Sequence, residues 1–206
     1  NEGRTVLFVS HNMTAIQNLC QSAILLSNGT IKEVGETGNI INRYFTSKKN
    51  KGSVLSEIKE RNGNGTLLFT KGNIKTINSD IYNAVDSFSE VLIELEFKTK
   101  ENYVVNHARI DIGINNILGD RIAWLSSDTI GSSPDLSFGK LNFHISNFPL
   151  APGDYNCNLY CEINNEVADW LGDVIEFSVV EKDYYLSGKK VPSNQGDILL
   201  KYKVVI

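Results

Sequence analysis

The stretch Glu90-Val-Leu-Ile-Glu-Leu-Glu-Phe-Lys-Thr-Lys100 decides the fold of this chain, because apolar and charged residues alternate along it. Successive side chains of a β-strand point to opposite faces, so the apolar residues at every second position from Val91 to Phe97 would share one face. The stretch His107-Ala-Arg-Ile-Asp-Ile-Gly-Ile-Asn115 repeats this alternation. Both stretches therefore predict strands with one buried and one solvated face, as antiparallel sheets have.

Six further segments carry strand-like patterns, and turn-rich stretches separate them. They span residues 67–77, 121–126, 140–147, 154–163, 174–180 and 197–206. Strands of this length and spacing predict a mainly β fold, an antiparallel β-sandwich of the Ig-like or jelly-roll type, over residues 66–206. All four prolines fall between these segments, which agrees with the prediction because proline cannot donate to a strand ladder.

The first 46 residues have a different, α/β pattern. Residues 5–10 are largely apolar or β-branched and predict a short buried strand, and Asn12 could cap a helix after it. Residues 23–34 predict a hairpin, and the apolar residues Ile40, Ile41, Tyr44 and Phe45 recur with a helical period. Because these few elements cannot bury a core of their own, we expect residues 1–46 to be the end of a larger domain.

Residues 47–65 are rich in lysine and glycine and predict a linker, within which a short helix over residues 53–59 is possible. Five basic residues gather between Lys48 and Arg61, and such a cluster could contact lipid headgroups or RNA. The net charge of the chain is −4, without the basic surplus of a nucleic-acid-binding protein. We therefore interpret the cluster as part of a solvated linker and expect no nucleic-acid partner.

The composition is that of an ordinary soluble globular protein, with 41% hydrophobic and 21% charged residues. No run approaches the about 20 uncharged apolar residues that cross a bilayer, and no signal-peptide layout is present, so we expect a cytosolic chain.

Cys157 and Cys161 would lie about 13 Å apart in one strand, too far for a disulfide, so we expect buried free thiols. Neither Cys20 nor the histidines complete a metal site with them, so no metal is predicted.

The first part of the chain resembles the end of an ABC-transporter ATPase domain. The resemblance rests on the strand over residues 5–10, on Ser10-His11-Asn12 and the helix after it, and on a hairpin ending in Ser27-Asn28-Gly29-Thr30-Ile31. The resemblance implies that His11 is the switch histidine of a parent ATPase, where it contacts the γ-phosphate of ATP or the attacking water. The chain contains no G-x-x-x-x-G-K-[S/T] loop and no apolar strand that ends in paired acidic residues for magnesium. We therefore expect a fragment without catalytic residues or cofactors of its own, whose full-length parent binds ATP and Mg.

The order of the parts narrows the resemblance. The chain resembles the Wzt-type ATP-binding subunits of bacterial O-antigen and other polysaccharide ABC exporters. In both, the end of an ATPase domain is followed by a helix, a linker and a β-sandwich. Local sequence agrees at residues 110–116, at Pro149-Leu-Ala-Pro-Gly-Asp-Tyr155 and at Asp173-Val-Ile-Glu-Phe-Ser-Val179. The resemblance implies that the sandwich binds the O-antigen polysaccharide of lipopolysaccharide for transport. It also implies a cytoplasmic subunit, peripheral to the inner membrane through a membrane-spanning exporter subunit.

A sugar-binding face needs aromatic rings for the apolar side of a pyranose and polar groups for its hydroxyls. In an Ig-like strand order, strands 107–115 and 154–163 are neighbours, with strand 121–126 beside them. Asp169 and Trp170 would lie in the loop after strand 154–163. The carbohydrate-binding candidates are outward residues of these strands and residues of the adjoining loops: His107, Arg109, Asp111, Trp124, Asp128, Asn158, Tyr160 and Trp170.

These candidates also have structural interpretations. Trp124 and Trp170 could be buried core or loop-packing residues, because large aromatic side chains are mostly buried. Arg109 and Asp111 could form a surface ion pair worth less than about 1 kcal/mol.

Two alternative functions stay open. The sandwich could be a structural dimerisation module that binds no glycan. It could also be a glycan-active hydrolase, for which Asp169 with Asp173, or Glu94 with Glu96, would supply the two carboxylates.

Residues 197–206 alternate apolar residues with Lys201 and Lys203, which predicts a final strand. An unpaired strand of this kind is prone to aggregate. The connection over residues 181–196 is long enough to reach its own sheet or that of a partner. The resemblance implies exchange, so we expect a homodimer in which this strand joins the partner's sandwich, with folding back within one chain as the alternative.

Overall fold

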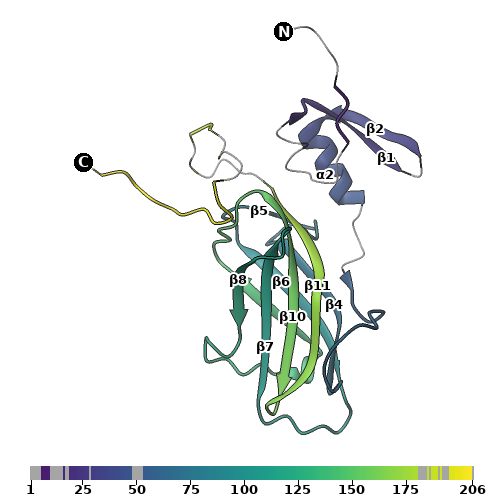
Figure 1. The fold of residues 1–206 in the computed structure, drawn as a ribbon, viewed down its shortest axis with the longest axis vertical. Coiled ribbons are helices and arrows are strands. Elements are labelled where there is room, and N and C mark those ends of the chain that lie inside the picture. Colours follow the sequence, from purple (N-terminus) through teal and green to yellow (C-terminus); the bar gives the residue numbers. More distant parts are fainter. Residues whose placement is uncertain are drawn as a thin grey trace.

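The computed structural model describes residues 6–9, 16, 19–27, 29–47, 53–180, 185, 187–189, 191 and 195–205. A small α/β part precedes a β-sandwich along the chain, and Figure 1 shows both. His11, the predicted switch histidine, lies outside the described residues. None of the helices within these ranges is long and apolar enough to cross a membrane.

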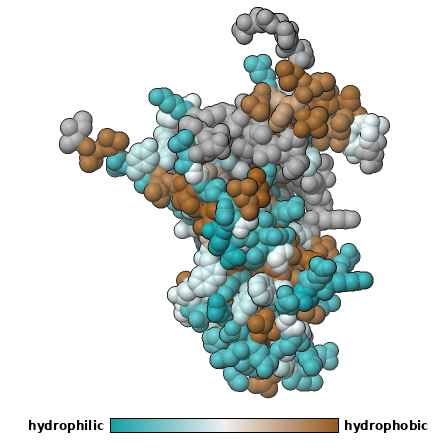
Figure 2. All heavy atoms as spheres, viewed as in Figure 1, coloured by the Kyte–Doolittle hydropathy of each residue, from teal (hydrophilic) through white to brown (hydrophobic). Residues whose placement is uncertain are grey.

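Strands β1 (Ser22–Ser27) and β2 (Thr30–Glu36) form the predicted antiparallel hairpin. Gly29 lies in its turn with a φ of 75°, a left-handed conformation that glycine adopts without strain. Ile24 and Leu26 on β1 are 50% and 62% exposed. Figure 2 shows apolar side chains gathered over this hairpin, which therefore presents an uncovered apolar face.

Helix α2 (Thr37–Ser47) follows the hairpin at the predicted place. Its Ile40 and Ile41 are 4% and 3% exposed, so these two residues of the predicted apolar face are buried. Ile41 packs with Ala84 of the sandwich in a small apolar cluster, through which α2 contacts the larger part of the chain.

The described part of the strand predicted over residues 5–10 is not in strand conformation. Residues 6–9 belong to no strand, and Val6 and Val9 are 81% and 94% exposed. A strand that is apolar on both faces forms only between neighbouring strands, and within the described ranges no segment pairs with residues 6–9.

The sandwich contains strands β3 to β11 and one short 3-10 helix. Their bounds are β3 Ser53–Val54, β4 Leu67–Thr76, β5 Ala84–Asp86, β6 Val91–Thr99, β7 Ala108–Asn116, β8 Arg121–Ser126, the 3-10 helix Leu136–Phe138, β9 Lys140–Ile145, β10 Gly153–Ile163 and β11 Glu166–Val180. Backbone pairing follows the order β8-β7-β10-β11-β5-β4-β6-β9, with β3 beside β4. Short β5 is parallel to both β11 and β4, whereas the other pairs are antiparallel. The sheet curls at β5, so that β8-β7-β10-β11 packs over β4-β6-β9 as the predicted mainly β sandwich (Figure 1).

The core lies between these two layers and follows the predicted alternation. The isoleucines of β7 are at most 1% exposed, and burying each such side chain contributes about 1.5–3 kcal/mol. Tyr155 of β10 stacks on Phe177 of β11 with ring centroids 5.6 Å apart. Cys157 and Cys161 are unbonded and 0% exposed, which confirms the predicted buried thiols. Burial raises the pKa of each of these two thiols to about 12.

Residues 53–65, which the sequence predicts as part of a linker, pack against the sandwich. The helix considered over residues 53–59 does not form, because β3 takes strand conformation and pairs with β4. The next residue, Leu55, is 1% exposed and belongs to the main core. Burial of this side chain and the pairing of β3 with β4 hold the start of the segment on the sheet.

The end of this segment is fixed on β11. Asn62 pairs with β11 in the antiparallel sense, and Gly63 has a φ of 130°. Gly63 lies so close to the backbone of Ala168 that a Cβ atom would overlap it, so only glycine fits there. The guanidinium of Arg61 reaches the buried carboxylate of Asp169, with Nη1 3.0 Å from Oδ2.

The C-terminal segment pairs with the sandwich at its start, and its Leu200 and Tyr202 contact Tyr185. Residues 197–199 pair with residues 149–151 through two backbone hydrogen bonds of 2.7 and 2.9 Å. Residues 200–205 belong to no strand within the described ranges, and Figure 1 shows them leaving the body as an extended segment. Tyr202 and Val204 are 70% and 87% exposed.

Candidate functional site

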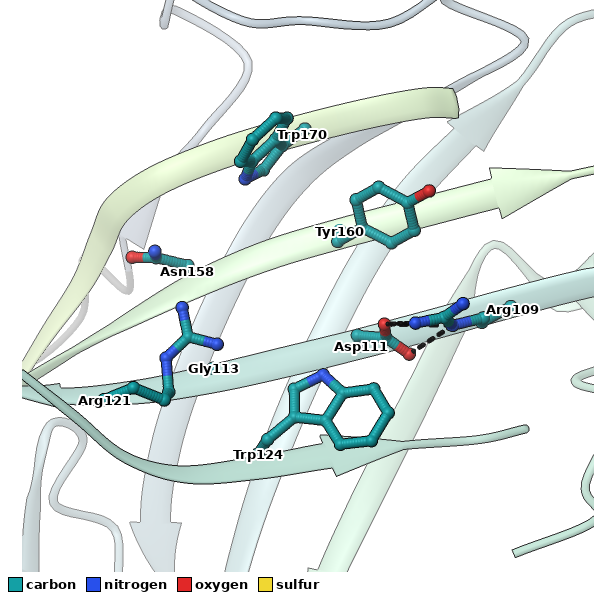
Figure 3. A pocket seen from close by; sticks show the side chains of 8 residues that line it. All are labelled: Arg109, Asp111, Gly113, Arg121, Trp124, Asn158, Tyr160 and Trp170. Carbon is teal, nitrogen blue, oxygen red and sulfur yellow. Dashed lines mark hydrogen bonds and ion pairs between the residues drawn. The ribbon is translucent and has the colours of Figure 1, made fainter. Parts of the chain in front are cut away.

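The outward face of the layer β8-β7-β10-β11 carries an open pocket of about 210 Å³ (Figure 3). Alternation along β7 and β10 turns every second side chain away from the core and toward this face. Strand pairing then places Tyr160 opposite both Asp111 of β7 and Trp170 of β11, and Trp124 of β8 opposite Gly113. The pocket is lined by Arg109, Asp111, Gly113, Arg121, Trp124, Asn158, Tyr160 and Trp170.

Arg109 lies at the centre of an aromatic cluster at one end of the pocket. Its Nε and Nη2 atoms donate to the carboxylate of Asp111 over 2.6–3.0 Å, an arrangement that holds the guanidinium in one plane. Its Cζ atom lies 5.6 Å from the ring centroids of both Trp124 and Tyr160. The hydrogen bonds to Asp111 raise the pKa of Arg109, so its positive charge is permanent.

Tyr160 is held by two further contacts. Its hydroxyl donates to Oε2 of Glu162 at 2.8 Å, and its ring meets Trp170 edge-on with centroids 6.4 Å apart. Burial, followed by the hydrogen bond to Glu162, raises the pKa of Tyr160 to about 12. Its hydroxyl is therefore neutral at physiological pH.

A network of amide side chains forms the other end of the pocket. Asn115 is 4% exposed, and its Nδ2 lies 3.0 Å from Oδ1 of both Asn156 and Asn158 and 3.2 Å from Oδ1 of Asp173. Its own Oδ1 accepts a hydrogen bond from Nε of Arg121 at 2.6 Å. One buried amide therefore positions both Asn158 and Arg121 in the wall of the pocket.

The structure brings six of the eight predicted carbohydrate-binding residues together in this pocket: Arg109, Asp111, Trp124, Asn158, Tyr160 and Trp170. His107 and Asp128 do not line it and contact each other instead, with Nε2 3.5 Å from Oδ1. Trp124 and Trp170 are 47% and 49% exposed, so the interpretation of both as buried core residues is wrong. A glycan-binding role for these residues stays a prediction.

The placement of Asp169 and Trp170 in a loop is wrong. Both lie within β11, which begins at Glu166 rather than at residue 174. The reason is a turn of only two residues, Asn164 and Asn165, whose φ values of 52° and 68° reverse the chain at once. Trp170 therefore projects from a paired strand, which fixes its position beside Tyr160.

Sequence reasoning missed Gly113 and Arg121 in the pocket. Regular alternation would turn Arg121 to the same face as Ala123, toward the core. Pairing shows a bulge, because Ile114 pairs with Ala123 and Asn115 with Arg121, which leaves one extra residue in β8. The extra residue turns Arg121 to the face of Trp124, and no sequence signal marks such a bulge. The guanidinium of Arg121 lies directly over Gly113, where a Cβ atom would overlap it.

Most carboxylates considered for a hydrolase have structural partners away from the pocket lining. Asp169 is 0% exposed, and burial raises its pKa, although Phe69 N–H and Arg61 both donate hydrogen bonds to its carboxylate. Glu94 pairs with Lys75 on the opposite layer, with Nζ 3.0 Å from Oε1. Within the described ranges, no three His, Cys, Asp or Glu side chains are arranged to hold a metal ion.

Comparison with known proteins identifies the sandwich. The family model of the Wzt C-terminal domain matches residues 58–190, which is more than half of the chain. The crystal structure of the C-terminal domain of Wzt is similar with a TM-score of 0.59, over 76% of this chain and 92% of that chain, at 16% sequence identity. At this identity the likeness shows a shared fold.

Two curated relatives match shorter stretches. The teichoic acids export ATP-binding protein TagH of Levilactobacillus brevis is 39% identical over 44 residues, or 21% of this chain. The O-antigen export system ATP-binding protein RfbB of Klebsiella pneumoniae is 43% identical over 42 residues, or 20% of this chain. The aligned stretches span only 12% and 17% of the length of these relatives. The match over residues 58–190 decides the family: the chain belongs to the Wzt C-terminal domain family.

Proposed function

We propose that this sandwich is a non-catalytic glycan-recognition domain that binds the polysaccharide carried by an ABC exporter. The observation that carries the proposal is the pocket of Figure 3, in which Trp124, Tyr160 and Trp170 expose aromatic surface beside polar groups. Pyranose rings present apolar C–H faces that pack on aromatic rings and hydroxyls that exchange hydrogen bonds. Asn158 and Asp111, which line the pocket, would bond such hydroxyls.

The relatives supply the cellular context of this proposal. Their names describe ATP-binding proteins of teichoic acid and O-antigen export, and we propose that this chain is part of such a subunit. ATP and Mg would bind to the parent ATPase domain, with His11 as its switch histidine, and residues 1–206 alone would not hydrolyse ATP. The subunit would lie on the cytoplasmic side of the inner membrane, against a membrane-spanning exporter subunit.

The uncovered apolar face of the β1–β2 hairpin supports this context. Ile24, Leu26, Ile31 and Val34 of the hairpin are all at least half exposed, and apolar side chains gathered in this way often mark a protein–protein contact surface. The remainder of an ATPase domain would cover this face.

We also propose a homodimer formed by exchange of the C-terminal segment. Residues 200–205 carry exposed apolar side chains and belong to no strand among the described residues. Joining the sandwich of a second copy would satisfy their backbone hydrogen bonds, and exchange of an identical element is a low-cost route to a two-fold dimer.

Calorimetric titration with the polysaccharide purified from the producing cells tests glycan binding, with an unrelated glycan as control. Tyr160→Ala and Trp124→Ala should each weaken binding about ten-fold, the equivalent of one aromatic contact of ~1.4 kcal/mol. Both changes should leave the melting temperature nearly unchanged, because neither side chain belongs to the main core.

Phe138→Ala is the matched control, because Phe138 is an aromatic residue that is 73% exposed and lies outside the pocket lining. It should bind like the wild type. Unchanged binding by a protein that carries both Tyr160→Ala and Arg109→Ala would show that the chosen face is wrong. Absence of binding by the wild type would favour the structural dimerisation module.

A further inference from the structure

Arg121 is a cation of the pocket without a carboxylate partner. Its Nε donates to the amide oxygen of Asn115 at 2.6 Å. No carboxylate in the described part of the chain lies within ion-pair distance of its guanidinium, and its two Nη groups donate to no protein acceptor there. Arg109 differs, because Asp111 engages it through two nitrogens.

Among the charged groups of the pocket lining, Arg121 is the one that has no ion-pair partner in the described part of the chain. The lining contains two guanidinium groups and one carboxylate, and that carboxylate, Asp111, is engaged by Arg109. Two carboxylates lie next to the lining: Glu162 accepts from the Tyr160 hydroxyl, and Asp173 accepts from Asn115. Neither forms an ion pair with Arg121.

The surrounding residues hold this guanidinium over the pocket floor. Gly113 leaves the room in which the guanidinium lies, since a Cβ atom at that position would overlap it. Asn115 is buried and fixed by three polar neighbours, so the oxygen that anchors Nε is itself fixed. With Nε occupied, the two Nη groups are left to donate to a ligand.

We infer that the glycan bound here carries an anionic group, a carboxylate or a phosphate, and that this group binds to the Nη atoms of Arg121. The inference rests on the proposed glycan-binding function and names the chemical class of its ligand. Guanidinium donors match the paired oxygens of carboxylates and phosphates, which is why arginine recognises them so often. The aromatic cluster would hold the neighbouring sugar ring, and Arg121 would select for the charge.

The test uses the complete chain and the polysaccharide extracted from the producing cells. One portion stays as isolated, in a second the carboxyl groups are reduced to alcohols, and in a third the phosphates are removed with aqueous hydrogen fluoride. The wild type should lose about 10- to 100-fold in affinity for one treated form, as expected for a hydrogen bond to a charged group. The treatment that weakens binding identifies the anion.

Two variants connect this effect to Arg121. Arg121→Gln should bind the untreated polysaccharide as weakly as the wild type binds the treated form, and it should lose the salt dependence of binding. Gly113→Ala keeps the charge but displaces the guanidinium, so it should give the same loss with an unchanged melting temperature. Lys98→Gln, which removes an exposed cation from β6 on the other layer, is the matched control.

Each outcome decides the question. Equal wild-type affinity for all three forms, or tight binding of a polysaccharide without anionic groups, overturns the inference and leaves glycan binding intact. Loss of affinity on treatment that Arg121→Gln does not reproduce places the anion elsewhere and also overturns it. If the wild type binds none of the three forms, the proposed function itself fails.

Discussion

Replacement of Arg61 by alanine would leave a charge buried without its counter-ion. The carboxylate of Asp169 is 0% exposed and accepts hydrogen bonds from Arg61 Nη1 at 3.0 Å and from Phe69 N at 2.8 Å, both on Oδ2. Its other oxygen has no hydrogen-bond partner within the described ranges. Arg61 also donates to the backbone oxygens of Ile58 and Leu55, so it fixes the segment 53–65 on β11.

Breaking a buried ion pair on one side costs about 3–5 kcal/mol, which for a chain of this size lowers the melting temperature by roughly 10 °C. The loss should depend on pH. Burial already raises the pKa of Asp169 above its ordinary value, and Arg61 opposes this rise, so Arg61→Ala should raise that pKa further. A raised carboxyl pKa means that the folded state binds more protons than the unfolded state, so stability falls as pH rises between the two pKa values, by about 1.4 kcal/mol per pH unit.

Thermal melts of wild type and Arg61→Ala at about pH 4.5 and about pH 7.5 measure this effect. The difference in melting temperature should be small at the lower pH and large at the higher. Lys71→Ala is the control, because the Lys71–Glu96 pair is solvent-exposed at 3.8 Å and should contribute less than about 1 kcal/mol. Asp169→Asn combined with Arg61→Ala should recover part of the loss. A melting temperature of Arg61→Ala within about 2 °C of wild type at the higher pH, or an equal loss at both pH values, would refute the reasoning.

Three further predictions concern the core, the segment on β11 and the assembly. Because burial raises the pKa of Cys157 and Cys161 to about 12, neither should react with a thiol reagent at about pH 8 until the protein unfolds, which mass spectrometry after labelling measures. Labelling of either at the rate of a free thiol would contradict their burial. Gly63→Ala should destabilise the protein by about 2 kcal/mol or more, since the new Cβ meets the backbone of Ala168 at a φ of 130°, and a denaturant titration showing less than half of this would contradict the packing. Deletion of residues 197–206 should give monomer or aggregate on light scattering, and a truncated chain that still forms a soluble dimer would exclude strand exchange.

Much of the pocket could be predicted because regular alternation needs no knowledge of the fold. In β7 and β10 each core residue alternates in the sequence with a polar or small residue or a tyrosine, so Arg109, Asp111, Asn158 and Tyr160 could be assigned to one face from their spacing. The antiparallel neighbours of an Ig-like order then brought these residues together. Local pattern and overall topology agree over this part of the chain.

The missed features depend on backbone geometry that apolar patterns do not encode. The bulge that turns Arg121 into the pocket adds one residue to β8, and the two-residue turn before β11 extends that strand by eight residues over the predicted start. The segment 53–65 looked like a linker because it is polar, yet it attaches through backbone pairing, Leu55 and Arg61. The bulge and the turn are local backbone features, and the attachment of the segment is a tertiary contact made by residues that have no periodic pattern of their own.

The stack around Arg109 has a consequence for the entropy of binding. An arginine side chain carries about 2 kcal/mol of rotamer entropy, and ordering such a side chain at an interface usually opposes binding. Here Asp111, Trp124 and Tyr160 already order Arg109 in the free protein. The rotamer entropy of Arg109 is therefore lost when the protein folds and not when a ligand binds. A ligand that binds to this face therefore gains more binding free energy from each weak contact than it would on a mobile surface. Such a face can hold a polymer through several weak contacts, none of which has to be strong enough to prevent its release.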